Sequence, residues 1–537
     1  MGQATNGGMY LKSLNQYENF LLDLFSETSN YLVGEELNEL LQKQFGISSD
    51  YSRKVILRAV TNNIIHSSSP LTFGKRQFVY FGKIVYLSKE TIKKIAIKYR
   101  PPVYRLLFLI DLNEGILSYY EALKITSCPL DESSTKVSSL KEIITDLKAI
   151  NIIDIITDQL GVKYLIDQNK QSAKDSLIEM HYTKMYIDAI FLSDILTWLR
   201  KHNIIDNENV RFRNKSNPSI GVKHNNLVWD AFAYTRTTGI NVTVNNNANW
   251  SENKQTLVVL DAIINREYTD EDLQGFYSRV QIVINSVKTG IRKIMPIIIS
   301  KEISKFVSNK ISKLGFIHLS LGTVFGERIF DLINKLNLIK AEQLHRLENS
   351  EQFVENIENV LSTIRNTGQE TNLENIKGDL FEALLLSLLR YIYPDSMIDQ
   401  GKILKSLEDE EKYEYDFIIV SRNNNEIVVV EAKGYKSTAV IKLGDRDTKY
   451  TVRWFFRRTF PFFKKYFDPG FYNYPLKGCY ITTATFESEA IATLNILNES
   501  KIKPNQLNLY YDGNALLELV DRNNMTKISS LLKKYYM

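Results

Sequence analysis

Residues 413–433 read YEYDFIIVSRNNNEIVVVEAK, and this stretch decides the expected fold of the C-terminal part of the chain. Two apolar runs, FIIV and IVVV, flank a polar turn, which predicts a β-hairpin. Side chains alternate along a strand, so Glu431 and Lys433 are expected on one face, with Ala432 pointing away. Antiparallel pairing can bring Asp416 beside Glu431. The pattern therefore predicts two carboxylates and an ammonium group at one end of a hairpin.

A third carboxylate precedes the hairpin. The segment Gly378–Glu382 opens an apolar helix that continues to Leu389, and Glu382 is a charge among apolar residues. A buried carboxylate requires a partner or a metal ion. Mg²⁺ (or Mn²⁺) prefers oxygen ligands. The expected ligands are the side chains of Asp416, Glu431 and Glu382 and the backbone carbonyl of Ala432.

Lys433 completes the predicted catalytic set. Its ammonium group would orient or help to deprotonate an attacking water and would neutralise charge on the phosphorane. These roles together predict in-line hydrolysis of a phosphodiester bond. The predicted catalytic residues are Glu382, Asp416, Glu431 and Lys433.

These residues resemble the PD-(D/E)xK nuclease superfamily, which has the restriction-endonuclease-like fold, with Glu382 as its helix Glu, Asp416 as its strand Asp and Glu431 to Lys433 as its ExK. Farther along, residues 478–490 and 507–519 are similar to later elements of Mrr-type restriction nucleases. Two positions depart from these patterns. Tyr415 replaces the Pro of the name motif, and the Mrr type commonly has Gln at the position of Glu431.

The resemblance implies a metal-dependent endonuclease that hydrolyses DNA in prokaryotic restriction or anti-phage defence. Cutting both strands normally uses two active sites, so we expect a homodimer or higher homo-oligomer. The sequence leaves open whether a further partner protein takes part. Two alternatives remain: a DNA-binding regulator or scaffold that uses a nuclease fold without catalysis, and a structure-specific or RNA nuclease.

A basic and aromatic segment lies between Lys442 and Tyr474. Basic residues can neutralise phosphates, while aromatic residues either pack a helix or stack on unpaired bases. For the aromatic residues we favour packing, and for the cations near the ExK edge we favour a DNA cleft. The cations proposed to bind nucleic acid here are Arg453, Arg457 and Arg458.

The N-terminal segment resembles a winged helix-turn-helix. Residues 35–45 predict a helix that ends at Gly46, and Ser48 or Ser49 caps a second helix whose inward stripe includes Tyr51. Residues 70–81 then predict a hairpin with a basic tip. The outward cations proposed to bind DNA are Arg53, Lys54, Arg58, Lys75 and Arg76. A wedge that contacts protein is the alternative.

A second winged-helix unit is expected after the first, with helices over 116–126 and 136–150 and two short strands around Gly161. For this unit we favour the protein-contact reading, since its helix has mixed charge. The next region, with a helix over 184–201 and strands over 227–234, 256–264, 296–300 and 316–321, follows a nuclease-type order. Asp230 and Asp261 occupy ligand-like positions, but Ile263 stands where a catalytic Lys belongs. We expect either a degenerate nuclease-like domain or an unrelated α/β spacer.

The composition sets the broad class. With 537 residues, 44% hydrophobic and 24% charged, the chain is expected to be multidomain, mixed α+β and α/β, and globular. Its expected domains are 1–100, 101–170, 171–343, a helical connector over 344–377, and 378–537. Two cysteines far apart and no long apolar run predict a cytoplasmic protein without a membrane partner. The formal net charge of +5 permits nucleic-acid binding without requiring it.

Overall fold

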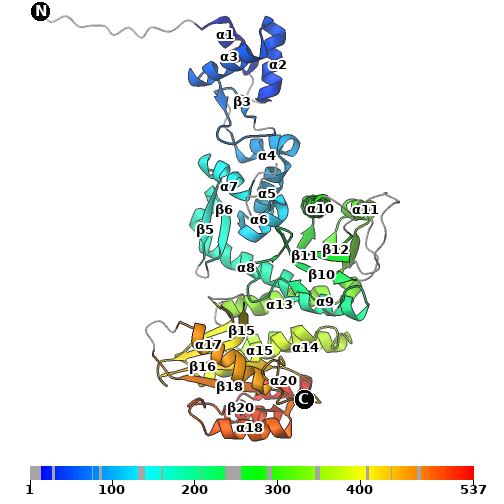
Figure 1. Ribbon diagram of the computed structural model, residues 1–537, viewed down its shortest axis with the longest axis vertical. Coiled ribbons are helices and arrows are strands. Elements are labelled where there is room, and N and C mark those ends of the chain that lie inside the picture. Colours follow the sequence, from blue (N-terminus) through cyan, green and yellow to red (C-terminus); the bar gives the residue numbers. More distant parts are fainter. Residues whose placement is uncertain are drawn as a thin grey trace, which may run out of the picture. The chain divides into compact units, whose positions relative to one another are not determined.

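The computed structural model describes residues 14–26, 31–74, 77–83, 87–130, 139–158, 161–206, 209–235, 256–286, 293–344, 351–406, 411–436, 438–468 and 473–537. The chain divides into two compact units. The first comprises Met1–His181, Asn225–Val228 and Asp270–Ile282, and the second comprises Tyr182–His224, Trp229–Thr269 and Val283–Met537. The fold is mixed α/β with several separate sheets, which confirms the expected fold class (Figure 1).

The first unit begins with a helix-turn-helix and a small sheet. Its elements are α1 Gln16–Leu24, β1 Tyr31–Val33, α2 Gly34–Phe45, α3 Ser49–Thr61, β2 His66–Ser67 and β3 Val79–Phe81. The strands pair in the order β1-β3-β2, antiparallel throughout. Gly46 ends α2 in a left-handed conformation with φ +65°, and the Ser48 side chain caps α3. One predicted position is wrong: Tyr51 is 40% exposed, because Ser52 and Ile56 take the inward face instead.

The same unit then repeats this arrangement of strand, two helices and two strands. Its elements are α4 Lys89–Tyr99, α5 Pro101–Leu112, β4 Ile116–Ser118, α6 Tyr119–Thr126, α7 Leu140–Ala149, β5 Ile153–Thr157, β6 Lys163–Asp167 and a 3₁₀ turn η1 Gln168–Ala173. The strands pair in the order β4-β6-β5. Residues 116–118, predicted as helix, form β4 because Leu117 pairs with Leu165 of β6, while the Ser118 side chain caps α6.

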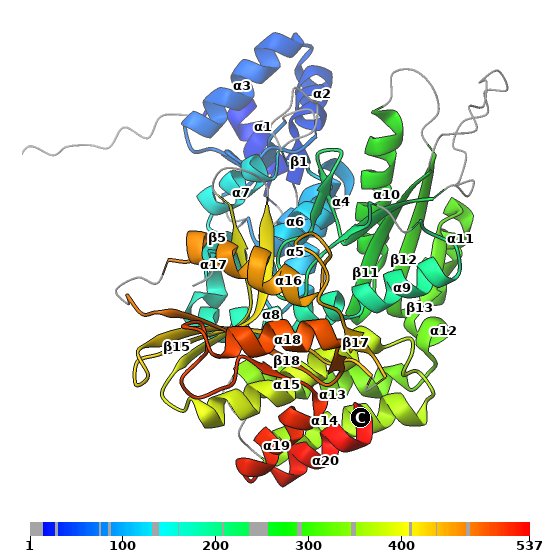
Figure 2. The same ribbon diagram turned by 60° about the horizontal axis from the view of Figure 1, so that its bottom comes forward.

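The second unit contains two α/β repeats, of which the first covers the middle of the chain. Apart from those residues of α8, β9 and α10 that the first unit comprises, its elements are α8 Lys174–Ile190, α9 Leu192–Lys201, β7 Arg211–Phe212, β8 Val222–His224, β9 Leu227–Trp229, β10 Ala231–Thr235, β11 Thr256–Tyr268, α10 Asp270–Asn285, β12 Ile294–Ile303, α11 Lys305–Leu314, β13 Ile317–Ser320, α12 Leu321–Phe325 and α13 Ile329–Leu344. The helix predicted over 184–201 is divided at Phe191, and the strand predicted over 227–234 is divided at Asp230. Figure 2 shows β11 and β12 side by side.

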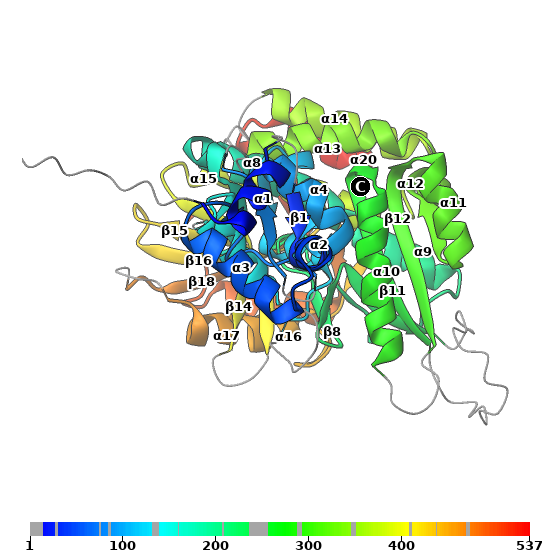
Figure 3. The ribbon, with the colours of Figure 1, turned by 90° about the horizontal axis from the view of Figure 1, so that it is seen from above.

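The second repeat follows directly. Its elements are α14 Glu351–Asn366, α15 Glu374–Ile392, β14 Met397–Lys405, β15 Lys412–Ser421, β16 Glu426–Lys433, β17 Val440–Ile441, α16 Val452–Trp454, a π-helical turn η2 Phe455–Thr459, α17 Phe460–Tyr466, β18 Leu476–Thr482, β19 Thr485–Phe486, α18 Ser488–Asn498, β20 Tyr510–Tyr511, α19 Gly513–Arg522 and α20 Thr526–Tyr535. Helix α15 begins four residues before the predicted start at Gly378. Helices α13 and α14 run side by side (Figure 3).

The sheets of the two repeats have the same topology. The first is ordered β7-β10-β11-β12-β13 and the second β14-β15-β16-β18-β20. In each, the first two pairings are antiparallel and the last two are parallel. Residues of both repeats belong to one buried apolar cluster, which includes Val258, Ile297, Phe381 and Val430. The two repeats therefore share a core.

The described residues include no helix with the length and apolar character needed to cross a bilayer. Both cysteines, Cys128 and Cys479, are buried and unbridged.

Candidate active site

The β15–β16 hairpin brings the predicted carboxylates together. Phe417 pairs with Val430, so that the preceding Asp416 lies opposite the following Glu431. Asp416 Oδ2 accepts a hydrogen bond from the backbone N–H of Ala432 at 2.7 Å. This bond fixes the Asp416 carboxylate against the end of β16. The local register, and not a distant contact, therefore sets the geometry.

Lys433 lies at the centre of this group. Its Nζ is 2.9 Å from Asp416 Oδ2, 2.9 Å from Glu431 Oε1 and 3.0 Å from the carbonyl oxygen of Ala432. The side chains of Lys433, Asp416 and Glu431 are 16%, 15% and 12% exposed. Three oxygens, from Asp416, Glu431 and Ala432, thus converge on one cationic centre that solvent can reach.

Helix α15 supplies Glu382 next to this group. Gly434 follows Lys433, and a Cβ added to Gly434 would lie 2.6 Å from Cβ of Phe381, so a larger residue would push the strand end away from the helix. Glu382 Oε2 accepts a long hydrogen bond from Gln400 Nε2 at 3.4 Å, and its Oε1 lies 3.9 Å from Lys215 Nζ. The close approach of strand and helix therefore places Glu382 beside the hairpin end.

Burial and like charge shift the ionisation of the site. Burial raises the pKa of Glu382 to about 8 and that of Glu431 to about 7, and the charge of Asp416 raises both. Burial opposes the charge of Lys433, but Asp416 and Glu431 hold its pKa well above the usual value. Carboxyl groups that resist ionisation until a cation neutralises them are typical of functional sites.

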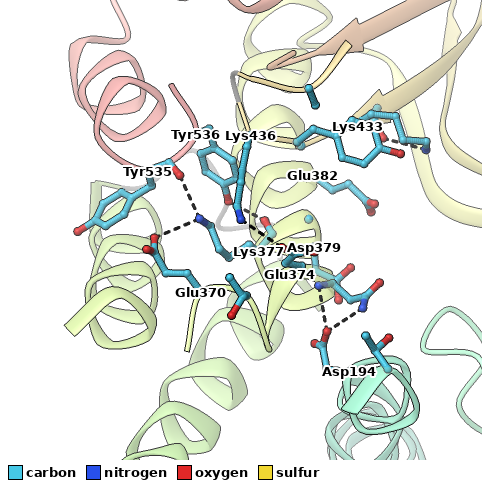
Figure 4. Close-up of a pocket in the computed structure, with 18 of the residues that line it drawn as sticks. Asp194, Glu370, Glu374, Lys377, Asp379, Glu382, Lys433, Lys436, Tyr535 and Tyr536 are labelled. Atoms are coloured by element: carbon cyan, nitrogen blue, oxygen red, sulfur yellow. Dashed lines mark hydrogen bonds and ion pairs between the residues drawn. The ribbon is translucent and has the colours of Figure 1, made fainter. Parts of the chain in front are cut away.

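A cavity of about 650 Å³ opens onto these residues. Glu382, Lys433, Asp379 and Lys377 line it, and Tyr536 closes one side (Figure 4). Lys377 is tied down, since its Nζ donates to the carbonyl of Tyr535 at 3.1 Å and pairs with Glu370 at 3.3 Å. The cavity therefore leaves Ala432 and Lys433, at the end of β16, accessible from outside.

Two residues of the site, Lys215 and Asp379, are not among those predicted from the sequence. Asp379 lies one turn before Glu382 on α15, and its Oδ1 accepts a hydrogen bond from Lys215 Nζ. Asp379 stands in the quoted segment Gly378–Glu382, so the helical spacing of 379 and 382 was a usable signal. Nothing in the sequence around Lys215 indicates its partner, because it lies 164 residues from Asp379.

The donor set of the hairpin end fits a hard divalent cation. Within the described ranges there is no cluster of three or more His, Cys, Asp or Glu side chains placed to hold a metal ion. However, the Lys433 ammonium already contacts two carboxylate oxygens and a carbonyl oxygen, which are the ligand types that Mg²⁺ and Mn²⁺ take. The ammonium group therefore marks a place where oxygens of Asp416, Glu431 and Ala432 could bind a metal ion.

In the basic and aromatic segment, the aromatic residues are mainly buried and the arginines lie nearer the surface. Phe455, Phe460 and Phe463 are buried in an apolar cluster with Tyr480, so the aromatic residues mainly form core. The three cations differ from one another. Arg453 Nη1 donates to the carbonyl of Gly444 at 3.2 Å, Arg458 Nη2 pairs with Glu411 at 2.9 Å, and Arg457 is exposed. Arg457 is the most available of them to an external anion.

The first helix-turn-helix exposes its predicted cations. Arg53, Lys54 and Arg58 lie on the solvent side of α3. Arg53 has a neighbouring acidic group, since its Nη1 is 3.7 Å from Asp50 Oδ1. Lys75 and Arg76 lie outside the described residues.

The middle repeat holds a second carboxylate pair in the corresponding place. Ala231 pairs with Leu260, so Asp230 and Asp261 match Asp416 and Glu431, and Ile263 matches Lys433. The backbone N–H of Ala262 donates to Asp230 Oδ2 at 2.8 Å, as Ala432 does to Asp416. Asp230 and Asp261 are both 0% exposed.

Side chains of the protein occupy both carboxylates of this buried pair. Arg213 Nη2 lies 3.1 Å from Asp230 Oδ1, and the Tyr268 hydroxyl donates to Asp261 Oδ2 at 2.9 Å. Arg213 is itself 2% exposed. We call the residues of the second unit between 182 and 344 the closed repeat and residues 351–537 the open repeat.

No family model matches the chain, and no curated protein matches it. Among solved structures, a structure of Can2 from Sulfobacillus thermosulfidooxidans in complex with cyclic tetra-adenylate (cA4) aligns with 58% of this chain and 80% of that chain. The aligned residues are 11% identical and the TM-score is 0.15. A likeness at this level says nothing about the activity of the present chain.

Proposed function

We propose that the chain is a metal-dependent endonuclease that hydrolyses DNA phosphodiester bonds, with its active site in the open repeat. The observation that carries the proposal is the convergence of Asp416 Oδ2, Glu431 Oε1 and the Ala432 carbonyl on one cationic centre beside a 650 Å³ cavity. The strand Asp, the ExK and the helix Glu also match the pattern of the PD-(D/E)xK superfamily. A role in restriction or anti-phage defence belongs to this proposal.

The residues divide the chemistry among them. A bound Mg²⁺ or Mn²⁺ would supply Lewis-acid activation of the phosphodiester and of the attacking water. Asp416, Glu431 and the Ala432 carbonyl would hold the ion, and Glu382 lies near enough to add an outer contact. Lys433, released from these oxygens, would orient the water and neutralise charge that develops on the phosphorane.

The first unit is proposed to bind the duplex. Arg53, Lys54 and Arg58 on exposed α3 would contact phosphates or bases in the manner of a recognition helix. The proposed catalytic centre around Lys433 would cut one strand at a time. We therefore also propose that duplex cleavage uses a homodimer or larger homo-oligomer.

The test is cleavage of supercoiled plasmid with Mg²⁺, Mn²⁺ or EDTA. Wild-type protein should nick the plasmid with either metal and be inert in EDTA, and Lys433→Ala should be slower by about 10²–10⁴-fold, because it loses the group that handles the water. Lys402→Ala is the matched control, since Lys402 also pairs with a carboxylate, Asp399, at 2.9 Å but on β14 outside the cavity. Thermal unfolding verifies that each variant is folded.

The substrate arms separate the alternatives. Duplex, single-stranded, junction and RNA substrates are compared under the same conditions. Preference for junctions or RNA would replace the DNA assignment by the structure-specific or RNA nuclease reading. If wild type cleaves none of these substrates, with or without metal, but still binds DNA, the scaffold function would replace the nuclease assignment.

A further inference from the structure

A loop of the closed repeat lies against the open repeat. Asn214 Nδ2 donates to Glu414 Oε2 at 2.9 Å, and the Ser216 hydroxyl donates to the other oxygen of Glu414. The backbone N–H of Ser216 donates to Asn214 Oδ1 at 2.8 Å, which holds the loop in a tight turn. A Cβ on Gly401, whose φ is +64°, would lie 2.7 Å from Ser216 Oγ. The loop is thus fitted to β14 and β15 on both sides of Lys215.

Lys215 reaches from this loop to helix α15. Its ammonium group pairs with Asp379 and lies 3.9 Å from Glu382 Oε1. Lys215 lines the active-site cavity and also a smaller neighbouring cavity of about 90 Å³ that Tyr182 and Tyr186 border. One lysine from the closed repeat therefore lies within the proposed catalytic site of the open repeat.

The charges of the site explain why a second ammonium group is needed. Four carboxylates, Asp379, Glu382, Asp416 and Glu431, lie within 4 Å of the Lys215 or Lys433 ammonium group. When all six are ionised, this group of side chains carries two negative charges, which one divalent cation neutralises. Other charged residues also line the cavity, but Lys377 pairs with Glu370 and Lys436 with Glu374. Without Lys215 the metal-loaded site would keep a negative charge and would repel a phosphodiester.

We infer that Lys215 is a positioning residue of the nuclease site: it neutralises Asp379 and Glu382, so that a DNA phosphate can approach the metal-loaded hairpin end. The inference rests on the proposed nuclease function and adds to it that the closed repeat completes the active site of the open repeat within one chain. Lys215 acts through the two carboxylates of α15 and makes no bond to the reacting atoms.

This role predicts opposite effects on two ligands. In Lys215→Met, the site gains a negative charge, so Mn²⁺ titrated without DNA should bind more tightly by about 3–10-fold. The same variant should bind a short fluorescent duplex in Ca²⁺ about 10-fold more weakly and cleave about 10–100-fold more slowly. Lys215→Arg, which keeps the charge, should restore most of the DNA binding.

Lys335→Met is the matched control. Lys335 pairs with Asp331 at 2.8 Å on α13 and lines neither cavity. This variant loses one lysine from an ion pair of the same unit and should leave Mn²⁺ affinity and DNA affinity within about twofold of wild type.

The outcomes separate the two proposals. If wild type cleaves DNA and Lys215→Met keeps wild-type Mn²⁺ affinity, DNA affinity and rate, the inference about Lys215 is wrong and the nuclease assignment stands. If Lys215→Met binds both Mn²⁺ and DNA more weakly, the lysine holds the loop in place, and the charge role is also wrong. If wild type never cleaves but Lys215→Met still shows the opposite shifts, the nuclease function fails while Lys215 keeps its role in ligand binding.

Discussion

The two repeats of the second unit place carboxylates at the same two strand positions, yet only the open repeat leaves them near solvent. Asp230 and Asp416 both accept a hydrogen bond from the alanine N–H that follows the second carboxylate, at 2.8 and 2.7 Å. In the closed repeat the countercharge is Arg213, which is 2% exposed, while in the open repeat it is Lys433, which is 16% exposed. The same backbone geometry thus supports an internal ion pair in one case and an exchangeable cation position in the other.

The comparison shows that the fold alone does not make the site. Ile263 stands where the open repeat has Lys433, so the closed repeat lacks an ammonium group at that position. Arg213 instead pairs with Asp230, the counterpart of Asp416, at 3.1 Å. The closed repeat is therefore suited to support its neighbour, and Lys215 shows one way in which it does so.

The largest difference between the repeats should come from a matched pair of substitutions. Asp416→Asn keeps a side chain of the same size but removes a charge that holds the cation, so cleavage should fall about 10³-fold with little loss of stability. Asp230→Asn should destabilise the fold and leave the cleavage rate per folded molecule unchanged. It leaves Arg213 buried without its full countercharge, which should lower the free energy of unfolding by about 3–5 kcal/mol. Initial cleavage rates per folded molecule and urea unfolding measure the two effects.

Equal loss of cleavage in both variants would mean that the closed repeat takes part in the chemistry. Tyr268→Phe provides a milder variant if Asp230→Asn fails to fold. It removes the hydroxyl that donates to Asp261 Oδ2 at 2.9 Å, and should lower the free energy of unfolding by about 1–3 kcal/mol without slowing cleavage.

A lysine placed in the closed repeat should not create a second site. Ile263 is 4% exposed, and Ile263→Lys puts an ammonium group near Asp230 and Asp261, which already have partners. We expect the free energy of unfolding to fall by about 3 kcal/mol. In the Asp416→Asn background, Ile263→Lys should give no cleavage. Recovered cleavage in that double variant would show that the closed repeat is one substitution from activity.

The sequence predicts the parts of the site that strand alternation and local register control. Glu431 and Lys433 share a face because they are two residues apart, and Asp416 lies opposite because the hairpin turn is short. The order of strands along the middle region is also predictable from the sequence. Its strand-for-strand match to the open repeat follows only from the strand pairings in the structure. Lys215 was not predictable, since a loop brings it to Asp379 across 164 residues. Tyr51 was misplaced because helical spacing alone left the choice of inward face between two adjacent stripes.

The smallest effect concerns the pH dependence of the contact between the repeats. Asp194 on α9 is 1% exposed, and its carboxylate accepts hydrogen bonds from the backbone N–H of Asn375 at 3.1 Å and of Ile376 at 3.3 Å, at the start of α15. Burial raises its pKa from the ordinary 3.8 to about 7, and the charge of Asp379 adds to this, although the bonds from Asn375 oppose it. The closed repeat thereby caps the helix that carries Glu382.

The sign of the pH effect follows from this raised pKa. Between pH 3.8 and about 7 the folded state holds a proton on Asp194 that the unfolded chain has lost, so the free energy of unfolding falls as the pH rises through this window. The contribution is complete below pH 3.8 and absent above about pH 7. Asp194→Asn cannot ionise, so its unfolding free energy should fall less steeply from pH 5 to pH 8 than that of wild type. Urea unfolding at several pH values measures both slopes, with exposed Asp331→Asn as the control, and equal slopes in wild type and Asp194→Asn would show that Asp194 ionises in the fold without penalty.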